Sequence, residues 1–188
     1  MSIDSKLRQI LFDLGFPPTS GADTPVFIFS SAELKHVWIA LQHRKWAVAD
    51  IVSDQLRARI TKARQMPLGA SGLFYCSDAE CFTVPFRIQS HPELADISDV
   101  WPGVWHFPFE IDPLGDLSKR IRLRDAKATW RALEGVSNVT KRINISGSMA
   151  FVPSWLYRED WDLILRTLST TPTESNQAMQ RTAGRSDA

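Results

Sequence analysis

PVFIFS, residues 25–30, is a short apolar run that begins at a proline and ends at a serine. Phenylalanine and β-branched residues favour extended backbone, so this run predicts a buried β-strand. Ser31 follows it and is a typical N-cap for a helix that would turn Val37, Trp38 and Leu41 inward. The stretch therefore predicts a strand followed at once by a helix, with Trp38 in the core.

Trp46 is expected on a connection beyond that helix. Arg44 and Lys45 precede it, and the next helical pattern begins only at Ser53 or Asp54. A tryptophan in such a place, beside cations, is predicted to be exposed. Three side chains are expected on the outer face of the second helix: Arg57, Lys62 and Arg64.

The rest of the chain predicts mostly antiparallel strands and a closing helix. Residues 72–76 and 81–89 are typical of a hairpin, and Pro85 indicates an edge or a bulge in its second strand. The other segments are strands at 104–111, 121–123, 139–145 and 149–152, a polar loop at 90–99, and helices at 125–134 and from Ser154 or Leu156.

This order predicts one α+β domain at residues 25–168, built around a curved sheet or a small open β-barrel with flanking helices. Residues 1–24 are expected to form an N-terminal helix and a linker, and residues 169–188 a disordered tail. No apolar run approaches the roughly 18 to 20 residues that span a bilayer, and no signal peptide is evident. The expected location is therefore the cytoplasm, without a membrane partner.

The sequence contains no motif typical of a catalytic or cofactor site. It has no Gly-rich phosphate loop, no Gly-x-Ser-x-Gly elbow and no His-x-x-x-His metal pair. His106 is expected as an ordinary strand residue. Cys76 and Cys81 flank the hairpin turn and are expected as reduced thiols, with a disulfide or a metal role as the alternatives. No enzyme activity, cofactor or metal is predicted.

Two segments are basic although the net charge of the chain is only +1. Residues 44–66 have six basic and two acidic side chains, and residues 116–142 have eight basic and three acidic ones. Such clusters are typical of proteins that bind a phosphate backbone. A solvated helix face has the same composition, so both interpretations stay open.

Trp46 and Trp101 differ from the other tryptophans by their place in the pattern. Trp101 opens a strand at a corner made by Pro102 and Gly103. Two facing indoles on rigid turns would hold a flat ring, and each aromatic–base stack contributes about 1–3 kcal/mol. The alternative is that both tryptophans fill the ends of the barrel.

The order and spacing of these segments resemble the YTH domains and the bacterial EVE domains of the PUA-like superfamily. The matching segments span about residues 25–153: the strand 27–31, Lys45-Trp46, the basic helix 55–64, the hairpin parts 73–75 and 86–88, the corner 101–107, and the segments 120–123 and 139–141. The corner WPGVWHF is similar to the Trp-x-Gly-x-aromatic strand entry of that family.

The resemblance implies a reader of modified bases. YTH domains bind N6-methyladenine in RNA, and EVE-like domains, often attached to restriction or defence proteins, are associated with modified DNA bases such as 5-methylcytosine. It implies base contacts from Ser30, Ser31, Trp46 and Trp101, and the predicted base site also includes Lys45, Ala47, Asp96 and Trp105. The residues expected at the nucleic-acid backbone are Arg44, Arg57, Lys62, Arg64, Lys141 and Arg142.

Two positions depart from the YTH pattern. Asp96 stands where these cages commonly have a further tryptophan, and Asn144-Ile145-Ser146 replaces an acidic turn. A carboxylate accepts a hydrogen bond from an exocyclic amine, so Asp96 or Asp99 would favour a modified cytosine in DNA over N6-methyladenine in RNA.

The predicted function is non-catalytic binding of a flipped-out modified base, with nucleic acid as the partner and an effector protein as a second one. Two rival functions stay open. One is a nucleic-acid-processing enzyme that recruits Asp96, Asp99 and His106, and the other is a protein-interaction domain with an aromatic patch.

Overall fold

A computed structural model describes residues 21–49, 53–146 and 149–170. The predicted N-terminal helix lies outside these residues, as do residues 171–188 of the predicted tail. The described part is a mixed α+β fold with an open eight-stranded sheet, which agrees with the predicted class. No helix in it is long and apolar enough to cross a membrane.

The main path of the sheet runs in the order β2-β6-β4-β3-β1-β8, and β5 and β7 pair with β6 and β4 respectively. β1 and β3 are parallel, whereas the other pairings are antiparallel. The strands are β1 (Thr24–Ser31), β2 (Lys45–Ala49), β3 (Ser71–Cys76), β4 (Cys81–Ile88), β5 (Ile97–Ser98), β6 (Trp105–Pro113), β7 (Ile121–Arg122) and β8 (Pro153–Leu156).

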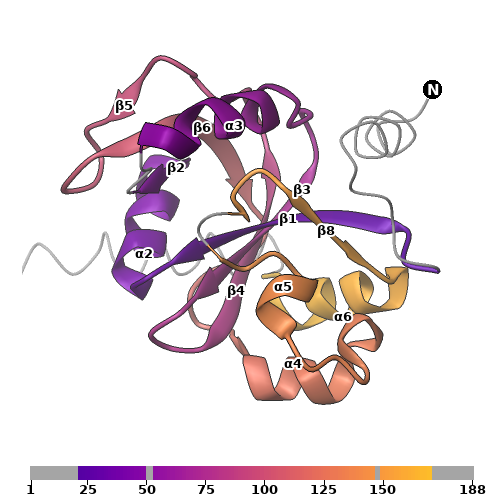
Figure 1. Cartoon of the computed structure of the whole chain (residues 1–188). Helices are drawn as coiled ribbons and strands as arrows, with labels where there is room; N and C mark the ends of the chain where they lie inside the picture. Colours follow the sequence, from indigo (N-terminus) through magenta and orange to yellow (C-terminus); the bar gives the residue numbers. More distant parts are fainter. Residues whose placement is uncertain (1–20, 50–52, 147–148, 171–188) are drawn as a thin grey trace, which may run out of the picture.

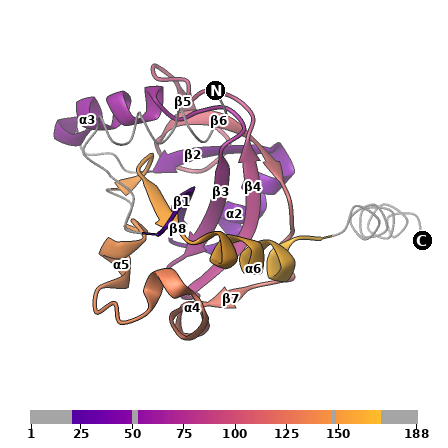
Figure 2. The ribbon, with the colours of Figure 1, turned by 90° about the vertical axis from the view of Figure 1, so that its right-hand side faces the viewer.

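The helices lie on two sides of strand β1. They are α2 (Leu34–His43), α3 (Ser53–Arg64), α4 (Leu123–Thr129), the 3-10 helix η1 (Arg131–Leu133), α5 (Val139–Arg142) and α6 (Arg158–Leu168). Figure 1 shows α3 above β1 and α4, α5 and α6 below it. The same separation is visible after a quarter turn (Figure 2).

Both faces of β1 are buried, which explains its continuous apolar sequence. Phe27 and Phe29 belong to the core on the side of α2 and α3, and Val26 and Ile28 belong to the core on the side of α4 to α6. Successive side chains of a strand point to opposite faces, so one short run contributes to both cores. The strand predicted from PVFIFS is confirmed.

The predicted hairpin and its irregularity are also confirmed. β3 and β4 pair with a register shift in which Leu73 faces Pro85 and Phe74 faces Thr83. Val84 is thereby the extra residue, with a positive φ of 36°. The proline lies at a β-bulge, the position where a missing N–H is tolerated inside a sheet.

Two expectations near the first helix are wrong. Trp38 is 55% exposed rather than in the core, because the inward stripe of α2 runs through Val37 and Ala40. Trp46 lies on strand β2 rather than on a connection, since α2 ends at Arg44 in the left-handed conformation and the chain then pairs with β6.

The C-terminal third also differs from the predicted pattern. Residues 139–145 were expected as a strand, but Val139–Arg142 form helix α5. Asn138 caps this helix by accepting a hydrogen bond from the backbone N–H of Lys141 at 3.0 Å. Val139 and Ile143 are four residues apart and both buried, a spacing that suits a helix as well as a strand.

Other boundaries shift in the same region. The strand expected at 149–152 is found at Pro153–Leu156, and α6 begins at Arg158. The helix expected at 125–134 is divided into α4 and η1 at Trp130. Ser169 was assigned to the disordered tail, but it bridges to Gly115, and the N–H of Thr170 donates to the carbonyl oxygen of Leu114 at 3.1 Å.

Candidate nucleic-acid interface

Three indole side chains, Trp46, Trp101 and Trp105, pack together and are called the tryptophan cluster below. The rings of Trp101 and Trp105 are stacked, with centroids 4.9 Å apart and an angle of 25° between their planes. Trp46 meets these rings at 76° and 80°, with centroid distances of 5.6 and 5.5 Å. β2 supplies Trp46, and β6 with the turn before it supplies the other two.

The members of the tryptophan cluster are buried, with exposed fractions of 1%, 2% and 5% for Trp46, Trp101 and Trp105. The prediction of an exposed Trp46 is therefore wrong. Its ring packs against Phe74 of β3, with centroids 4.7 Å apart. Trp46 and Trp101 are not parallel walls, and their burial matches the alternative in which both fill the interior.

His36 of α2 connects the tryptophan cluster to the end of β1. Its carbonyl oxygen accepts a hydrogen bond from Nε1 of Trp101 at 3.0 Å, and its ring meets Trp105 edge-on at 5.1 Å. Nδ1 of His36 lies 3.4 Å from the hydroxyl of Ser31. Burial lowers the pKa of His36, which favours the neutral ring. His36 thus joins three residues that the sequence assigned to base binding.

The turn between Trp101 and Trp105 has a backbone that requires glycine. Gly103 has a φ of +91°, and Nε1 of Trp105 donates to the carbonyl oxygen of Pro102 at 3.0 Å. A left-handed φ at Gly103 brings the chain back toward β6 without steric cost. Two hydrogen bonds from indole nitrogens therefore fix this corner, one to the turn itself and one to α2.

The polar residues at the end of β1 already have partners. The hydroxyl of Ser30 donates to the carbonyl oxygen of Ile145, and that of Ser31 donates to the carbonyl oxygen of Glu33 at 2.8 Å. Ala47 is fully buried next to Trp46, and Lys45 is half-buried opposite Glu110.

Asp96 faces another carboxyl group. It is exposed and hydrogen-bonded to Glu93, and this bond raises the pKa of Glu93, with burial and the charge of Asp96 adding to the effect. The backbone of Asp96 also accepts from the N–H of Phe107 at 3.3 Å. A short strand, β5, begins directly after it, within the segment expected as a polar loop.

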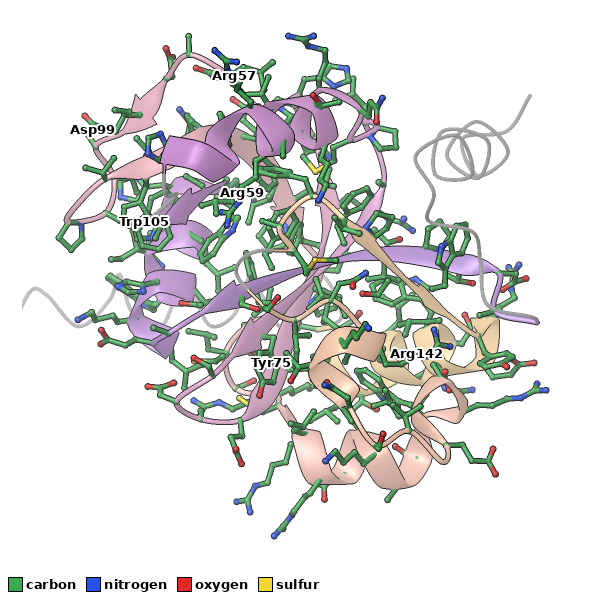
Figure 3. All side chains as sticks on the ribbon, in the orientation of Figure 1. Arg57, Arg59, Tyr75, Asp99, Trp105 and Arg142 are labelled. Carbon is green, nitrogen blue, oxygen red and sulfur yellow. The ribbon has the colours of Figure 1, made fainter. Side chains whose placement is uncertain are left out.

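Helix α3 has cations on two faces. Arg57 and Arg64 are exposed as predicted, and Lys62 is half-buried. Arg59, which the sequence did not single out, is only 5% exposed. Figure 3 shows Arg57 directed away from the fold and Arg59 directed from α3 into it. Burial lowers the pKa of Arg59, and burial together with the charge of Arg59 lowers that of Lys62.

The remaining predicted backbone contacts are not gathered at the tryptophan cluster. Arg44 pairs with Asp112 at 3.4 Å. Nε of Arg142 donates to the carbonyl oxygen of Ala132 at 3.1 Å, a contact that connects α5 to η1. Figure 3 shows Arg142 on the opposite side of β1 from Trp105, and Lys141 is its neighbour on α5.

Cavities of the described part of the structure include three that lie outside the tryptophan cluster. One, of about 500 Å³, includes Arg44 and Asp112. A second, of about 300 Å³, includes Lys141 and Asn144. The third, of about 710 Å³, lies at the turn between β3 and β4 and includes three arginines.

Within the described residues, no group of three or more His, Cys, Asp or Glu side chains could hold a metal ion. Cys76 and Cys81 face each other across β3 and β4 as free, buried cysteines. The thiol of Cys76 donates to the carboxylate of Asp78 at 2.7 Å. Burial, with this hydrogen bond, raises the pKa of Cys76 to about 12.

No known protein-family model and no curated protein matches the sequence. Among solved structures, the Mmi1 YTH domain in complex with RNA is similar, with 13% identity, a TM-score of 0.50, and coverage of 86% of this chain and 85% of that one. The YTH domain of Zygosaccharomyces rouxii MRB1 with N6-methyladenosine RNA gives 16% identity, a TM-score of 0.43, and coverage of 57% and 67%. Protein Atu2648 from Agrobacterium tumefaciens gives 16%, 0.44, and 79% and 100%. The chain has a YTH-like fold.

Sequence reasoning found the members of the tryptophan cluster but missed His36, Phe74 and Arg59. His36 and Arg59 lie on predicted helices, and no local signal shows which turn of a helix faces a distant loop. Phe74 lies in a predicted strand. Its contact with Trp46 depends on the pairing of β2 at the far side of the sheet, which only the fold reveals.

Proposed function

We propose that this protein is a non-catalytic reader that binds a modified base of a nucleic acid at the tryptophan cluster. The observation that supports this most is the cluster itself. Three indoles from two strands and a turn meet beside the end of β1, and Trp101 and Trp105 are already stacked with centroids 4.9 Å apart. The similar Mmi1 YTH domain was solved in complex with RNA.

A base enters by replacing one indole in the stacked pair. An aromatic pair contributes about 0.5–1.5 kcal/mol beyond its buried area, and an indole–base stack about 1–3 kcal/mol. The stacking gained is therefore of the same order as the stacking lost, and the apolar area that the buried Trp101 exposes on leaving the core is a further cost that the backbone contacts offset. Trp101 is the indole that moves, since its link to α2 is the single hydrogen bond to His36 and it precedes the Gly103 turn.

The cations of α3 bind the flanking phosphates in this proposal. Arg57 and Arg64 are exposed on the helix whose other face holds Arg59 against the interior. Exposed guanidinium groups attract the backbone without reading its sequence. The identity of the bound base is the second part of the proposal. The two candidate ligands are a modified cytosine in DNA and N6-methyladenine in RNA, and the experiment below distinguishes them.

The test is a binding panel followed by intrinsic tryptophan fluorescence. Matched DNA and RNA oligonucleotides contain 5-methylcytosine, N6-methyladenine or the unmodified bases. We expect one modified oligonucleotide to bind most tightly, to change the fluorescence and to be recovered chemically unchanged. Recovery of the oligonucleotide without chemical change argues against a nucleic-acid-processing enzyme. A steep loss of oligonucleotide affinity with rising salt concentration argues against an apolar protein-interaction patch.

Two variants with the same chemical change separate the site from the core. Trp105→Leu removes the indole on which the base stacks once Trp101 has moved, and Trp130→Leu removes a buried indole in the other core. We expect Trp105→Leu to weaken binding by about 1–3 kcal/mol, and Trp130→Leu to lower stability while the affinity of the folded protein is kept. Equal affinities in wild type and Trp105→Leu would contradict the proposal.

A further inference from the structure

Three arginines in alternate positions, Arg120, Arg122 and Arg124, lie along the 710 Å³ cavity between the β3–β4 turn and β7. Between the first two, Ile121 is buried in the core of α4 to α6. Within β7, Ile121 and Arg122 point to opposite faces, and Arg120, directly before the strand, lines the cavity together with Arg122. Arg122 pairs with Cys81 of β4, and both residues line the cavity.

The three arginines differ in how they are engaged. Nε of Arg124 pairs with Asp125 at 3.3 Å, and Nε of Arg120 donates to the carbonyl oxygen of Leu117 at 3.3 Å. The guanidinium group of Arg122 makes no hydrogen bond or ion pair within the described part of the chain. Most donors of Arg120 and Arg122 are thus directed to solvent in the cavity.

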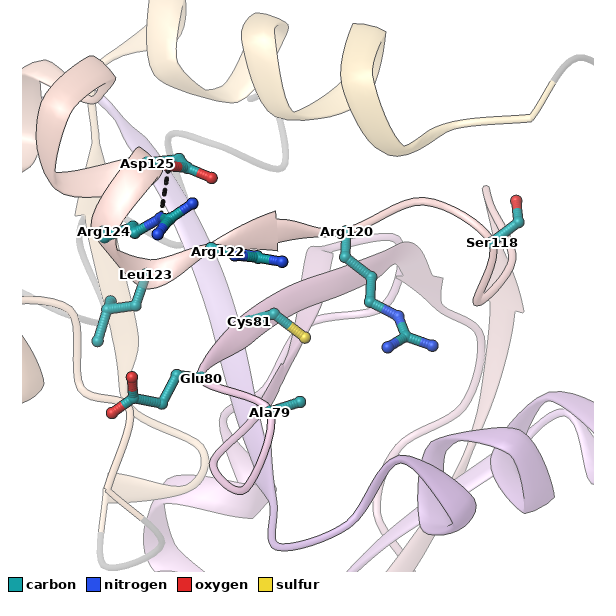
Figure 4. A pocket seen from close by; sticks show the side chains of 9 residues that line it. All are labelled: Ala79, Glu80, Cys81, Ser118, Arg120, Arg122, Leu123, Arg124 and Asp125. Carbon is teal, nitrogen blue, oxygen red and sulfur yellow. Dashed lines mark hydrogen bonds and ion pairs between the residues drawn. The ribbon is translucent and has the colours of Figure 1, made fainter.

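The carboxylates of this region do not neutralise the two guanidinium groups. Asp125 is paired with Arg124, and Figure 4 shows the carboxylate of Glu80 directed away from Arg120. In the same view the Arg122 side chain is drawn above the Cys81 sulfur and the guanidinium group of Arg120 to its right. Two nearby cations with forked donors fit an anion that has several oxygen atoms and two negative charges.

We propose that this cavity is a phosphate-binding site in which Arg120 and Arg122 hold the phosphate oxygens. The ligand is a phosphate group, either of a nucleic-acid backbone or of a free phosphate compound such as a nucleotide. The site is separate from the tryptophan cluster and does not depend on base binding. Its volume also accommodates a ligand larger than a single phosphate ion.

The first experiment uses inorganic pyrophosphate and the full chain. We expect saturable NMR shifts at the amides of Cys81 and Arg122 and at the side-chain N–H of Arg120. The double variant Arg120→Gln/Arg122→Gln weakens this binding by about tenfold or more, because it removes two charge-assisted contacts. The double variant Lys127→Gln/Arg166→Gln removes the same charge from exposed positions outside the cavity and keeps the binding.

The second experiment identifies the source of the phosphate. For a single-stranded oligonucleotide, the salt dependence of affinity falls by about 0.7 in log–log slope for each lost phosphate contact, so about 1.4 is expected in the arginine double variant. Pyrophosphate binding together with this change assigns the site to a nucleic-acid backbone. Pyrophosphate binding with an unchanged slope assigns it to a free phosphate compound.

Either of two outcomes would overturn the proposal: NMR shifts that do not saturate with pyrophosphate, or shifts that respond equally to both double variants. The pyrophosphate result requires no bound base, so it stands even when the modified-base panel gives no preference.

Discussion

The indole Nε1 of Trp101 donates a hydrogen bond to the backbone carbonyl oxygen of His36, 3.0 Å away, although 65 residues separate them along the chain. This contact joins the turn before β6 to helix α2. It is the one long-range hydrogen bond that an indole of the tryptophan cluster donates in the described part of the structure, since Trp105 donates within its own turn to Pro102.

Replacing Trp101 by phenylalanine tests this contact. Trp101→Phe keeps an aromatic ring and removes the donor, so the carbonyl oxygen of His36 loses a partner. We expect the free energy of unfolding to fall by about 1 kcal/mol beyond the loss of packing. Urea denaturation measures it, with Trp105→Phe as the comparison that removes only a local bond. An unfolding midpoint equal to that of the wild type contradicts the expectation.

Trp46 and Trp38 are predicted to differ sharply in their effect on stability. Trp46 is 1% exposed and Trp38 is 55% exposed. Trp46→Ala opens a cavity in the core and is expected to cost about 3–5 kcal/mol, whereas Trp38→Ala is expected to change stability by about 0.5 kcal/mol or less. Circular dichroism in urea compares them. Similar costs for both would mean that α2 presents a different face to the sheet.

Asp160 is predicted to stabilise the start of η1. It is 3% exposed, and its two carboxylate oxygens accept the backbone N–H groups of Arg131 and Ala132 at 2.8 and 2.9 Å. Asp160→Asn replaces one acceptor by a donor that faces an N–H, so a loss of about 1.5–3 kcal/mol is expected.

The matched control for this change is Asp162→Asn, two residues further along the same helix and exposed. We expect a change near zero there. Thermal unfolding at several scan rates gives the comparison, and a loss shared by both variants would assign the effect to the charge of α6 rather than to the two hydrogen bonds.

The thiol of Cys76 is predicted to lower stability at alkaline pH. Burial, aided by the hydrogen bond to Asp78, raises its pKa from 9.0 to about 12. Above pH 9 the unfolded thiol ionises while the folded one stays protonated, so the free energy of unfolding falls between pH 9 and about 12. Below pH 9 both states hold the proton and Cys76 adds no pH dependence.

Cys76→Ala isolates this effect from other groups that titrate in the same range. The difference in stability between wild type and Cys76→Ala should be constant below pH 9 and should then change in favour of the variant. In the native protein at neutral pH, alkylation of Cys76 should be slow. Rapid alkylation of the folded chain would show that its pKa is not raised.

The central strands were predictable because their sequence suits only one environment. The run 25–30 is apolar on both faces, and the hairpin around Pro85 has a turn, two apolar strands and a proline that needs a bulge. Each of these signals is local. The class of fold and the presence of one sheet with flanking helices follow from them.

The exposure of single residues was less predictable. Trp46 follows two cations and a helix end, which indicates solvent, but β6 arrives from 60 residues later in the chain and pairs with it. Trp38 differs by one position from the inward stripe of α2, and one position turns a side chain by about 100° on a helix. Both errors come from tertiary contacts that overrode a correct local pattern.

The segment 139–145 was ambiguous in the sequence itself. Val139 and Ile143 have a spacing that fits a short strand and a helix equally, and Asn138 caps the helix that forms there. This moved Lys141 and Arg142 away from the predicted interface. The site residues that the fold brings together are therefore mainly aromatic.

The pairing of β8 with β1 has a consequence for synthesis of the chain. β1 is hydrogen-bonded to β3 on one side and to β8 (Pro153–Leu156) on the other. Along the sequence, β1 and β8 lie near opposite ends of the described residues. Until β8 has emerged from the ribosome, the edge of β1 that pairs with β8 has no hydrogen-bond partner, and the aromatic side chains of β1 lie beside it. A nascent or C-terminally shortened chain therefore exposes unpaired backbone N–H and C=O groups of β1, which can pair with another copy of the chain. Chaperones are expected to bind the chain until β8 has emerged from the ribosome and pairs with β1.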